Sequence, residues 1–344
     1  MKSPRKLFDE EYRLDKISKQ SDPLEKLNRN IDFELFRKTL EDYFDMSSRD
    51  KSKGGRPQYD CVMMFKILVL QRYYNLSDDA IEYAILDRLS FMRFLGLTLS
   101  DRIPDAKTVW YFKNQLAQGD LFKDIFNKLD MMLNQRGIIA HEGKMMDASF
   151  VEVPRQRNTR EENAQIKCGE VPDDWQDDAN KLRQKDLSAS WTKHNGTNYY
   201  GYKDHVKADV KTKLITGYEV TPAHVHDSNL LEELLTTQDL YQPLWADSAF
   251  RSDEAEKMLA GKKIKSEIHE KGYRGKPLTK KQMKGNKKKS QVRARVEHIF
   301  AFMENSMNGM YLLCRNLVNV RAAIGMMNIT YNLFRLTQLN KSLA

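Results

Sequence analysis

The sequence predicts an α/β protein in which an all-helical region precedes a domain of mixed strands and helices. Apolar residues recur at helical spacing up to about residue 135. Beyond residue 140, alternating stretches rich in β-branched residues take turns with helical ones, in the order β-β-β-α-β-α-β-α-α. A chain of 344 residues corresponds to about two domains. We therefore expect a lead-in and linker at 1–55, a helical domain at 56–138 and a mixed-sheet domain at 139–344.

The helices are expected in the first 135 residues. Residues 1–55 should be weakly ordered around one short helix near 31–44, and KSKGGRP at 51–57 has the Gly pair and the Pro of a linker. Ser77 should cap a helix whose first turn holds two acids. The remaining helices are predicted at 58–74, 88–95, 107–117 and 120–135.

The strands begin at GKMMDASFVEVP (143–154), whose alternation and terminal Pro are typical of a strand. Two more strands, 199–210 and 214–223, flank the turn KTK. The polar, acidic segment 155–192 is expected to be an irregular insertion or a long hairpin loop. The later elements are predicted as a helix from Asp227 to about 238, a strand ending in QPLWADSAF, a helix opened by Ser252, a strand at 263–270, a basic loop, and helices at about 288–307 and 318–337.

The net charge of +9 is concentrated in one stretch of the chain. Residues 262–295 contain 14 Lys and Arg against two acids, whereas residues 161–186 contain eight acids against four bases. A Lys-rich segment beside folded structure is typical of a surface that contacts phosphate, so a nucleic-acid partner is indicated. A solvated charged face is the alternative interpretation.

Composition excludes several other classes of protein. The three Cys are far apart and form no C-x-x-C pair, which argues against a disulfide framework and a thiolate zinc site. No apolar run approaches the roughly 20 residues that span a bilayer. The first residues, MKSPRKLFDEEYRL, lack the apolar region of a secretory signal. We expect a cytoplasmic protein with no membrane partner.

Three acids are candidates for chemistry. Asp147 lies inside an apolar strand and Asp247 at the end of another, and burying an isolated acid is costly unless it is paired or binds a cation. Glu297 lies on the rim of the apolar stripe of a late helix, with Arg293 one turn earlier and in reach. A shared cation site is one interpretation. A helix cap at Asp247 and a surface ion pair at Glu297 are the other.

Four segments, in order, resemble the DDE transposases of bacterial insertion sequences, and among them the insertion-sequence-five (InsH-like) family. These segments are KMMDASFVEVP, GYKDHVKADVKTKLITGYEVTPAHVHDSN, LWADSAFRS and RARVEHIF. GRPQYDCVMMFKILVLQRYYNLSDDAIEYAILDRLSFMRFLGL and IPDAKTVWYFKNQL resemble that family's helical region. The resemblance covers about residues 50–335. It implies a ribonuclease-H-like catalytic domain, and it implies that Asp147, Asp247 and Glu297 form the catalytic triad.

The sequence departs from the related pattern Tyr-x-x-Arg-x-x-x-Glu-x6-Lys. Arg293 and Glu297 fit this pattern, but Ser290 takes the place of the Tyr and Glu304 that of the Lys. Because that Lys holds DNA phosphate in the family, its role needs a substitute here. The nearby bases that could supply one are Lys287, Lys288, Lys289 and Arg295.

The implied reaction is metal-dependent phosphoryl transfer on DNA. Two Mg²⁺ ions, with Mn²⁺ able to substitute, would activate the attacking oxygen and stabilise the leaving oxygen. We expect Asp147 to bridge both ions, Asp247 to hold one and Glu297 the other. The attacking group would be water first and a transposon 3′-hydroxyl later.

Two surfaces are expected to contact DNA. Lys107, Thr108, Tyr111 and Lys113 would suit a recognition helix, although an ordinary packing helix has the same pattern. Arg56 in the linker could contact phosphate. Near the acids, the expected contacts are Lys287, Lys288, Lys289, Arg293, Arg295 and His298.

The sequence therefore predicts a DNA transposase that binds insertion-sequence ends, cleaves DNA and transfers strands. The expected partners are double-stranded terminal inverted repeats and target DNA, and a homodimer, formed in response to DNA, is expected in a nucleoid-associated bacterial protein. A catalytically silent transposase-derived DNA-binding protein and a general metal-dependent nuclease are the alternatives.

Overall fold

A computed structural model of the chain describes residues 9–44, 58–273 and 275–339. The chain divides into two compact units. The helical unit ends at Leu121 and takes in the last residues from Asn332, and the sheet unit runs from Phe122 to Tyr331. The sheet unit starts before the boundary expected at residue 138, because the helix α8 (Leu121–Gln135) packs on the sheet. The rings of Phe126 and Tyr218 meet edge to face at 4.8 Å, and Lys123 Nζ lies 2.5 Å from Glu219 Oε1.

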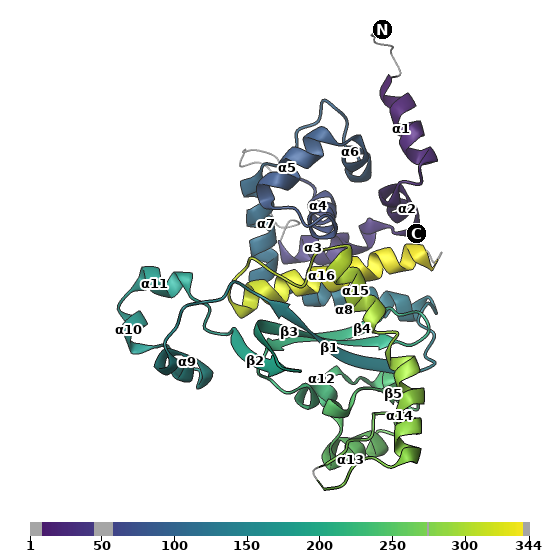
Figure 1. Cartoon of the computed structure of the whole chain (residues 1–344). Helices are drawn as coiled ribbons and strands as arrows, with labels where there is room; N and C mark the ends of the chain where they lie inside the picture. Colours follow the sequence, from purple (N-terminus) through teal and green to yellow (C-terminus); the bar gives the residue numbers. More distant parts are fainter. Residues whose placement is uncertain (1–8, 45–57, 274, 340–344) are drawn as a thin grey trace. The chain divides into compact units, whose positions relative to one another are not determined.

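The helical unit consists of short helices joined by tight turns (Figure 1). Its elements are α1 (Asp9–Lys19), α2 (Pro23–Asn30), η1 (Phe33–Phe36), α3 (Arg37–Tyr43), α4 (Cys61–Tyr73), α5 (Asp78–Asp87), α6 (Leu89–Leu95) and α7 (Ala106–Gln118). The helices predicted for 58–117 are confirmed. The expectation of a weakly ordered lead-in was wrong for the described residues 9–44, which form three helices and a 3₁₀ turn.

Capping explains where several of these helices begin. Asp22 accepts a hydrogen bond from the Leu24 amide, and Pro23 occupies the first turn of α2, where its missing N–H costs nothing. Ser77 caps α5 through the Ala80 amide, as predicted. Buried apolar residues then hold the lead-in helices in the core of the unit: Leu24, Leu27, Phe33, Phe36 and Leu40. The linker at 51–57 lies outside the described residues.

The sheet unit alternates strands with helices. Its first elements are α8 (Leu121–Gln135), β1 (Lys144–Glu152), α9 (Arg160–Lys167), α10 (Asp173–Gln176), α11 (Ala179–Gln184), β2 (Ser190–His194), β3 (Thr197–Asp209) and β4 (Ile215–Pro222). These are followed by η3 (Asp227–Leu230), α12 (Leu231–Leu234), η4 (Thr237–Asp239), β5 (Pro243–Trp245), η5 (Ser248–Phe250), α13 (Asp253–Gly261), β6 (Lys265–Ser266), α14 (Lys280–Arg293), α15 (Glu297–Asn305) and α16 (Leu317–Gln338).

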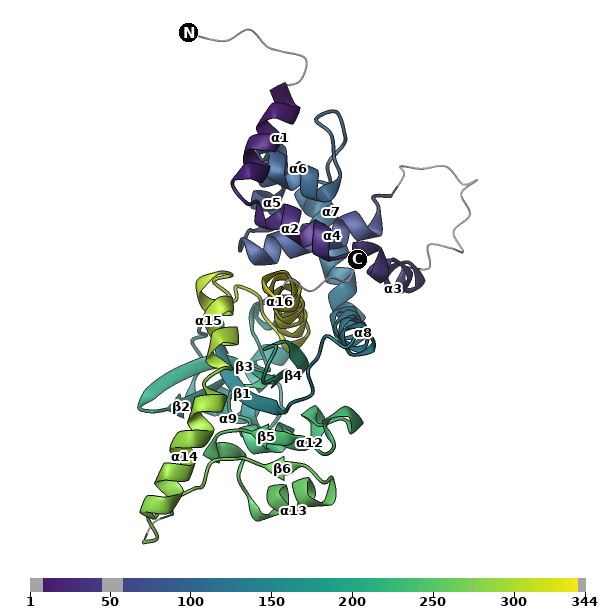
Figure 2. The same cartoon turned by 90° about the vertical axis from the view of Figure 1, so that its right-hand side faces the viewer.

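The sheet has the order β4-β3-β1-β5-β6, with β2 also paired to β3. The β1, β3 and β4 strands are antiparallel, and β5 and β6 continue the sheet parallel to β1. Helices α8 and α16 cover one face and α12 and α13 the other (Figures 1 and 2). Three antiparallel strands followed by two parallel ones, with the first strand in the centre, are the ribonuclease-H-like arrangement. The predicted fold class is confirmed.

Three of the predicted elements differ in the structure. Segment 155–192 is not an irregular loop, because it folds into α9, α10, α11 and the strand β2. The buried Trp175 is its centre, and its indole N–H donates to Glu162 Oε1 at 2.6 Å. The helix expected from Asp227 to 238 is broken into η3, α12 and η4, and the strand expected at 263–270 is reduced to β6.

The basic stretch also differs from its prediction. The loop expected before 288 contains most of α14, which starts at Lys280 behind a Thr279–Gln282 capping box. The single helix expected at 288–307 is broken, because residues 294–296 form turns between α14 and α15. The amides of Arg295, Val296 and Glu297 bond to carbonyls three residues earlier.

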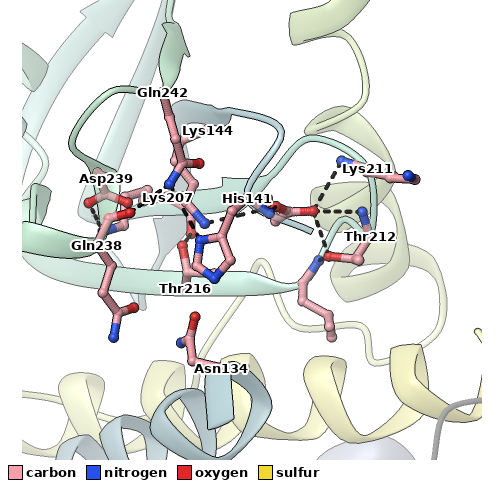
Figure 3. A network of polar contacts seen from close by, with 12 residues as sticks. Asn134, His141, Lys144, Lys207, Lys211, Thr212, Thr216, Gln238, Asp239 and Gln242 are labelled. Carbon is pink, nitrogen blue, oxygen red and sulfur yellow. Dashed lines mark hydrogen bonds and ion pairs between the residues drawn. The ribbon is translucent and has the colours of Figure 1, made fainter. Parts of the chain in front are cut away.

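A buried polar network ties the start of β1 to the end of β3 and to η4 (Figure 3). Lys207 Nζ lies 2.5 Å from Asp239 Oδ2, and Lys144 Nζ lies 3.9 Å from Asp209 Oδ2. Asp209 also accepts from Thr212 through both its amide and its hydroxyl. The two Lys are tolerated in the interior because each faces a carboxylate.

None of the helices among the described residues is long and apolar enough to cross a membrane.

Candidate active site

Asp147 lies in the middle of β1, the central strand of the sheet. β1 pairs with β3 along its whole length, and Asp147 is opposite Val206. Successive side chains alternate between the two faces of a strand, so Asp147 and Met146 point to opposite faces. Met146 is fully buried in the core on the face of the sheet that α12 and α13 cover. The backbone of Asp147 is therefore fixed by the sheet, and its carboxyl group is partly exposed.

Asp247 follows β5, the parallel neighbour of β1. The last paired residues of the two strands are Met145 and Trp245. Asp147 and Asp247 each lie two residues beyond this pair, at the same edge of the sheet. Asp247 Oδ1 accepts from the Ala249 amide at 2.7 Å and so caps the η5 turn. The alternative of a cap for the next helix is excluded, because Ser252 caps α13.

The carboxyl group of Asp147 has an unusual environment. Burial raises its pKa to about 6, Arg293 acts to lower the pKa, and the negative charge of Asp247 raises it further. Asp147 Oδ1 accepts from the Ala148 amide at 3.0 Å, and Oδ2 accepts from Arg293 Nη1. The Arg293 and Asp147 side chains are 23% and 18% exposed, so this ion pair is poorly screened by water. The two carboxylates of Asp147 and Asp247 are thus electrostatically coupled at one place, with Arg293 as the nearby cation.

Glu297 does not join this pair in the structure. It is exposed in the first turn of α15, behind the break at 294–296. In the described part of the chain, no three Asp, Glu, His or Cys side chains come together as a group that could hold a metal ion. The structure therefore brings together two of the three predicted acids. The place of Glu297 in the triad stays a prediction.

The predicted contact between Arg293 and Glu297 was wrong. They were expected one turn apart on a single helix, but Arg293 ends α14 and Glu297 begins α15. α14 ends at Arg293, whose side chain donates to Asp147 instead. Val296, within the break, is fully buried. Glu304, at the place of the family's Lys, is exposed on α15.

His269 is a candidate that sequence reasoning missed. It follows β6, and its amide donates to the Ala246 carbonyl at 3.1 Å, next to Asp247. Its ring Nε2 lies 3.3 Å from Ser290 Oγ, at the position of the family's Tyr. Burial lowers the pKa of His269, and Arg293 lowers it further, so the ring is neutral near pH 7. Its position after a predicted strand could have identified it, because the carboxyl ends of parallel strands share one edge of a sheet.

The basic residues near the acids divide into two groups. Lys287 and Lys288 are exposed on α14. Lys289 Nζ donates to the Ile268 carbonyl at 2.8 Å, and Arg295 Nη1 to the Val210 carbonyl at 3.2 Å, so each has a partner within the protein. His298 is exposed in α15. α14 extends from the sheet beside β5 (Figures 1 and 2).

The residues proposed to contact DNA in the helical unit also fall into two groups, exposed ones and ones with partners within the protein. Lys107 and Tyr111 are exposed on α7, whereas Lys113 Nζ lies 2.6 Å from Asp78 Oδ1 on α5. Thr108 is half-buried, and its amide donates to the Asp105 cap. Lys113 thus has a partner within its unit, which the packing interpretation of this helix predicts. Arg56 lies outside the described residues.

The Asp147 and Asp247 carboxylates suit a hard divalent cation, which prefers oxygen ligands. Their coupled negative charges at one sheet edge are the observation that supports this fit. Arg293 is the cation that occupies Asp147 Oδ2 in this structure. Two carboxylates from the protein leave coordination positions for water and a phosphate oxygen, as Mg²⁺ sites usually do.

Two family models match parts of this chain. Residues 12–115 match a family model described as transposase domain (DUF772), and residues 140–333 match one described as transposase DDE domain. Among solved structures, a cryo-EM structure of the piggyBac transposase synaptic complex with hairpin DNA is 15% identical, with a TM-score of 0.45, over 93% of this chain and 75% of that one. Because the DDE match spans more than half of the chain, the protein belongs to the transposase DDE domain family.

Proposed function

We propose that this protein is an insertion-sequence transposase whose catalytic acids are Asp147, Asp247 and Glu297. The observation that carries this proposal is the coupled pair of Asp147 and Asp247 at one edge of a ribonuclease-H-like sheet. Family membership supports DNA cleavage and strand transfer as the reaction. Asp147 and Asp247 are 100 positions apart in the sequence, and the parallel pairing of β1 with β5 supports their assignment to one site.

The residues of the site would divide the work as follows. Asp147, on the central strand, and Asp247, at the η5 turn, hold the cation site in fixed positions. Glu297 completes the triad from the first turn of α15, which carries no side-chain cap and can adjust. Two Mg²⁺ ions, when bound, would activate the attacking oxygen and neutralise charge on the phosphate. Mn²⁺ is expected to substitute.

Bases on α14 would hold the DNA strand beside these acids. Lys287 and Lys288 are exposed and suited to phosphate. Lys289 donates to the carbonyl of Ile268, the residue before His269. We propose Lys289 as the substitute for the Lys that the family pattern places at Glu304. Arg295 and His298 remain proposed contacts of the same surface.

The decisive experiment compares Asp147→Asn, Asp247→Ala and Glu297→Gln in a DNA cleavage assay with Mg²⁺. The substrate is duplex DNA that carries the sequences bordering the gene. Each variant should lose cleavage by roughly 10³-fold or more and keep its affinity for DNA. Glu304→Gln, on the same helix as Glu297, is the matched control and should cleave normally. Cleavage by Asp247→Ala at the wild-type rate would rule out this site.

The same assay separates the two rival functions. A catalytically silent DNA-binding protein would bind the bordering sequences and leave them intact. A general nuclease would cut duplexes of unrelated sequence equally well. The transposase should cut only at defined ends and join the resulting 3′-hydroxyl to a second duplex.

We propose α7 as the element that reads the ends. Lys107→Gln with Tyr111→Ala should weaken binding to the bordering sequences more than to unrelated DNA. Lys113→Gln is the control, because its ion pair with Asp78 belongs to the packing of the unit. Equal weakening for every DNA sequence would show that α7 contacts only phosphate. Arg56 is a further proposed phosphate contact.

A dimer that forms on paired ends is the proposed assembly. Light scattering of the protein with and without end DNA tests it, and a mass of two protomers only with DNA is the expected result. Localisation to the cytoplasm and nucleoid is part of the same proposal.

A further inference from the structure

A further carboxylate, Asp227, lies in the η3 turn, which contacts the η5 turn that Asp247 caps. It is the first residue of η3, the turn that follows β4. Lys203 Nζ, from β3, lies 2.7 Å from Asp227 Oδ1 and donates at 2.9 Å to the Val225 carbonyl. One ammonium group thus fixes both the backbone and the side chain at the start of η3. The Lys203 side chain is 10% exposed, so water screens this pair weakly.

His205 lies beside the same pair and adds no charge to it. Its side chain is fully buried, its Nε2 lies 2.8 Å from Thr221 Oγ1, and its Nδ1 lies 3.7 Å from Asp227 Oδ1. Burial lowers the pKa of His205 to about 4, so the ring is neutral at pH 7. Lys203 is therefore the cation that balances Asp227 within this group.

One apolar cluster holds the three Asp-bearing segments together. Met146 precedes Asp147, Ala246 precedes Asp247, and Leu230 closes the η3 turn that Asp227 opens; all three are buried in the same cluster. Phe250, at the end of the η5 turn that Asp247 caps, belongs to it as well. The η3 and η5 turns also contact each other directly. A shift of η3 is therefore transmitted to the turn that carries Asp247.

From these contacts we propose that Asp227, held by Lys203, is a positioning residue of the active site that fixes the Asp247 turn relative to Asp147. This inference rests on the proposed function. It concerns a residue outside the triad and outside the expected DNA contacts.

The chain contains a matched control for this pair. Lys207, four residues further along the same face of β3, forms a more deeply buried ion pair with Asp239, at 2.5 Å. That pair belongs to the network of Figure 3, at the start of β1 rather than beside Asp147. Asp239→Asn should therefore lower stability without changing the catalytic rate of the folded protein.

The experiment measures kcat, KM for DNA and the unfolding midpoint of the full chain with Asp227→Asn, Asp227→Glu and Asp239→Asn. Asp227→Asn should lower kcat by roughly 10–100-fold with KM unchanged, at a temperature where every variant is folded. Asp227→Glu keeps the carboxylate that pairs with Lys203 and should recover part of the rate. Lys203→Met should repeat the loss of kcat.

The outcomes separate the two proposals. If wild type cleaves and Asp227→Asn cleaves at the same kcat, the positioning role is refuted and the proposed function stands. The role is refuted as well if Asp227→Asn and Asp239→Asn lose activity only in proportion to unfolding. If wild type does not cleave end DNA with Mg²⁺, both proposals fail.

Discussion

Arg293 Nη1 donates a hydrogen bond to Oδ2 of Asp147, across 146 positions of sequence. This contact joins the last residue of the basic helix α14 to the central strand of the sheet. It places Arg293 on the acid itself, where the sequence pattern predicted a phosphate contact. The two roles make different predictions for substitution.

Arg293→Gln should slow cleavage and shift its pH dependence. Without the guanidinium, the pKa of Asp147 rises above about 6, so the carboxylate is lost at a higher pH. The acid limb of the pH–rate profile of cleavage should move to higher pH, while DNA affinity stays within about twofold. Arg293→Lys, which keeps the charge, is the control. A fall in affinity with a salt slope reduced by about 0.9 would instead identify a phosphate contact.

Lys287 and Lys288 provide the test of the basic helix. Lys287→Gln with Lys288→Gln should weaken DNA binding and reduce the slope of log K against log salt by about 2, because two phosphate contacts are removed. Fluorescence anisotropy at several salt concentrations measures both effects. Lys211→Gln is the control, since this exposed Lys pairs with Glu142 outside α14. An unchanged slope would contradict the assignment of this surface to DNA.

Lys207→Met should destabilise the sheet unit by about 3–5 kcal/mol, because it leaves the carboxylate of Asp239 buried without a cation. The Lys207 and Asp239 side chains are 1% and 2% exposed. Urea unfolding followed by circular dichroism gives the free energy. Lys207→Met combined with Asp239→Leu removes both charges and should recover most of the loss. A single variant as stable as wild type would show that the pair is solvated in solution.

Stability should depend on pH through Asp204, which is fully buried on β3 and accepts from Asn328 Nδ2 at 3.2 Å. Burial raises its pKa to about 7 in the folded protein, compared with about 4 in an unfolded chain. Between these values the folded state keeps a proton that the unfolded state has lost. The stabilisation is therefore complete below about pH 4 and is lost as the pH rises through about 7.

Asp204→Asn should remove this dependence. The difference in unfolding free energy between wild type and variant should change by up to about 1.4 kcal/mol per pH unit between pH 4 and 7. Comparing the two proteins cancels the contribution of Asp130, whose pKa burial raises to about 6. Parallel stability curves would mean that Asp204 is already ionised in the fold.

Local patterns predicted the strands of the site well. The alternation in GKMMDASFVEVP identified β1 and placed Asp147 within it, and the turn KTK separated β3 from β4. These signals are short-range, since a strand shows its period within a few residues. A shared site for Asp147 and Asp247 was one interpretation of the pattern and was implied by the resemblance, and the parallel register of β1 and β5 supplies a physical basis for it.

The break between α14 and α15 could not be predicted in the same way. Residues 294–296 are Ala, Arg and Val, with neither Gly nor Pro to end a helix. The break depends on burial of Val296 and on the bond from Arg293 to Asp147, which are both tertiary contacts. The start of α14 had a local signal in the Thr279–Gln282 capping box. The Lys-rich helix that follows buries none of its residues and so shows no apolar period.

The sequence also concealed α2, although Asp22 and Pro23 are a recognisable helix start. This region was expected to be weakly ordered, but Leu24 and Leu27 are buried against the rest of the unit. Composition averaged over 55 residues cannot show which few side chains reach a core. The ion pair of Lys113 was not predicted for a related reason, because its partner Asp78 lies on another helix.

Asp147 lies on a strand and Glu297 at the start of a helix, so the free energy of local unfolding should differ between them. β1 is bonded to β3 along its length and to β5 on the other side, so exposing the Asp147 amide requires much of the sheet to unfold. Glu297 begins a helix whose first turn lacks a side-chain cap, and helix ends fray at little cost. Amide hydrogen exchange should therefore be slow at Asp147 and fast at Glu297. The sheet would hold Asp147 in place before DNA binds, whereas Glu297 would move into place when the substrate binds.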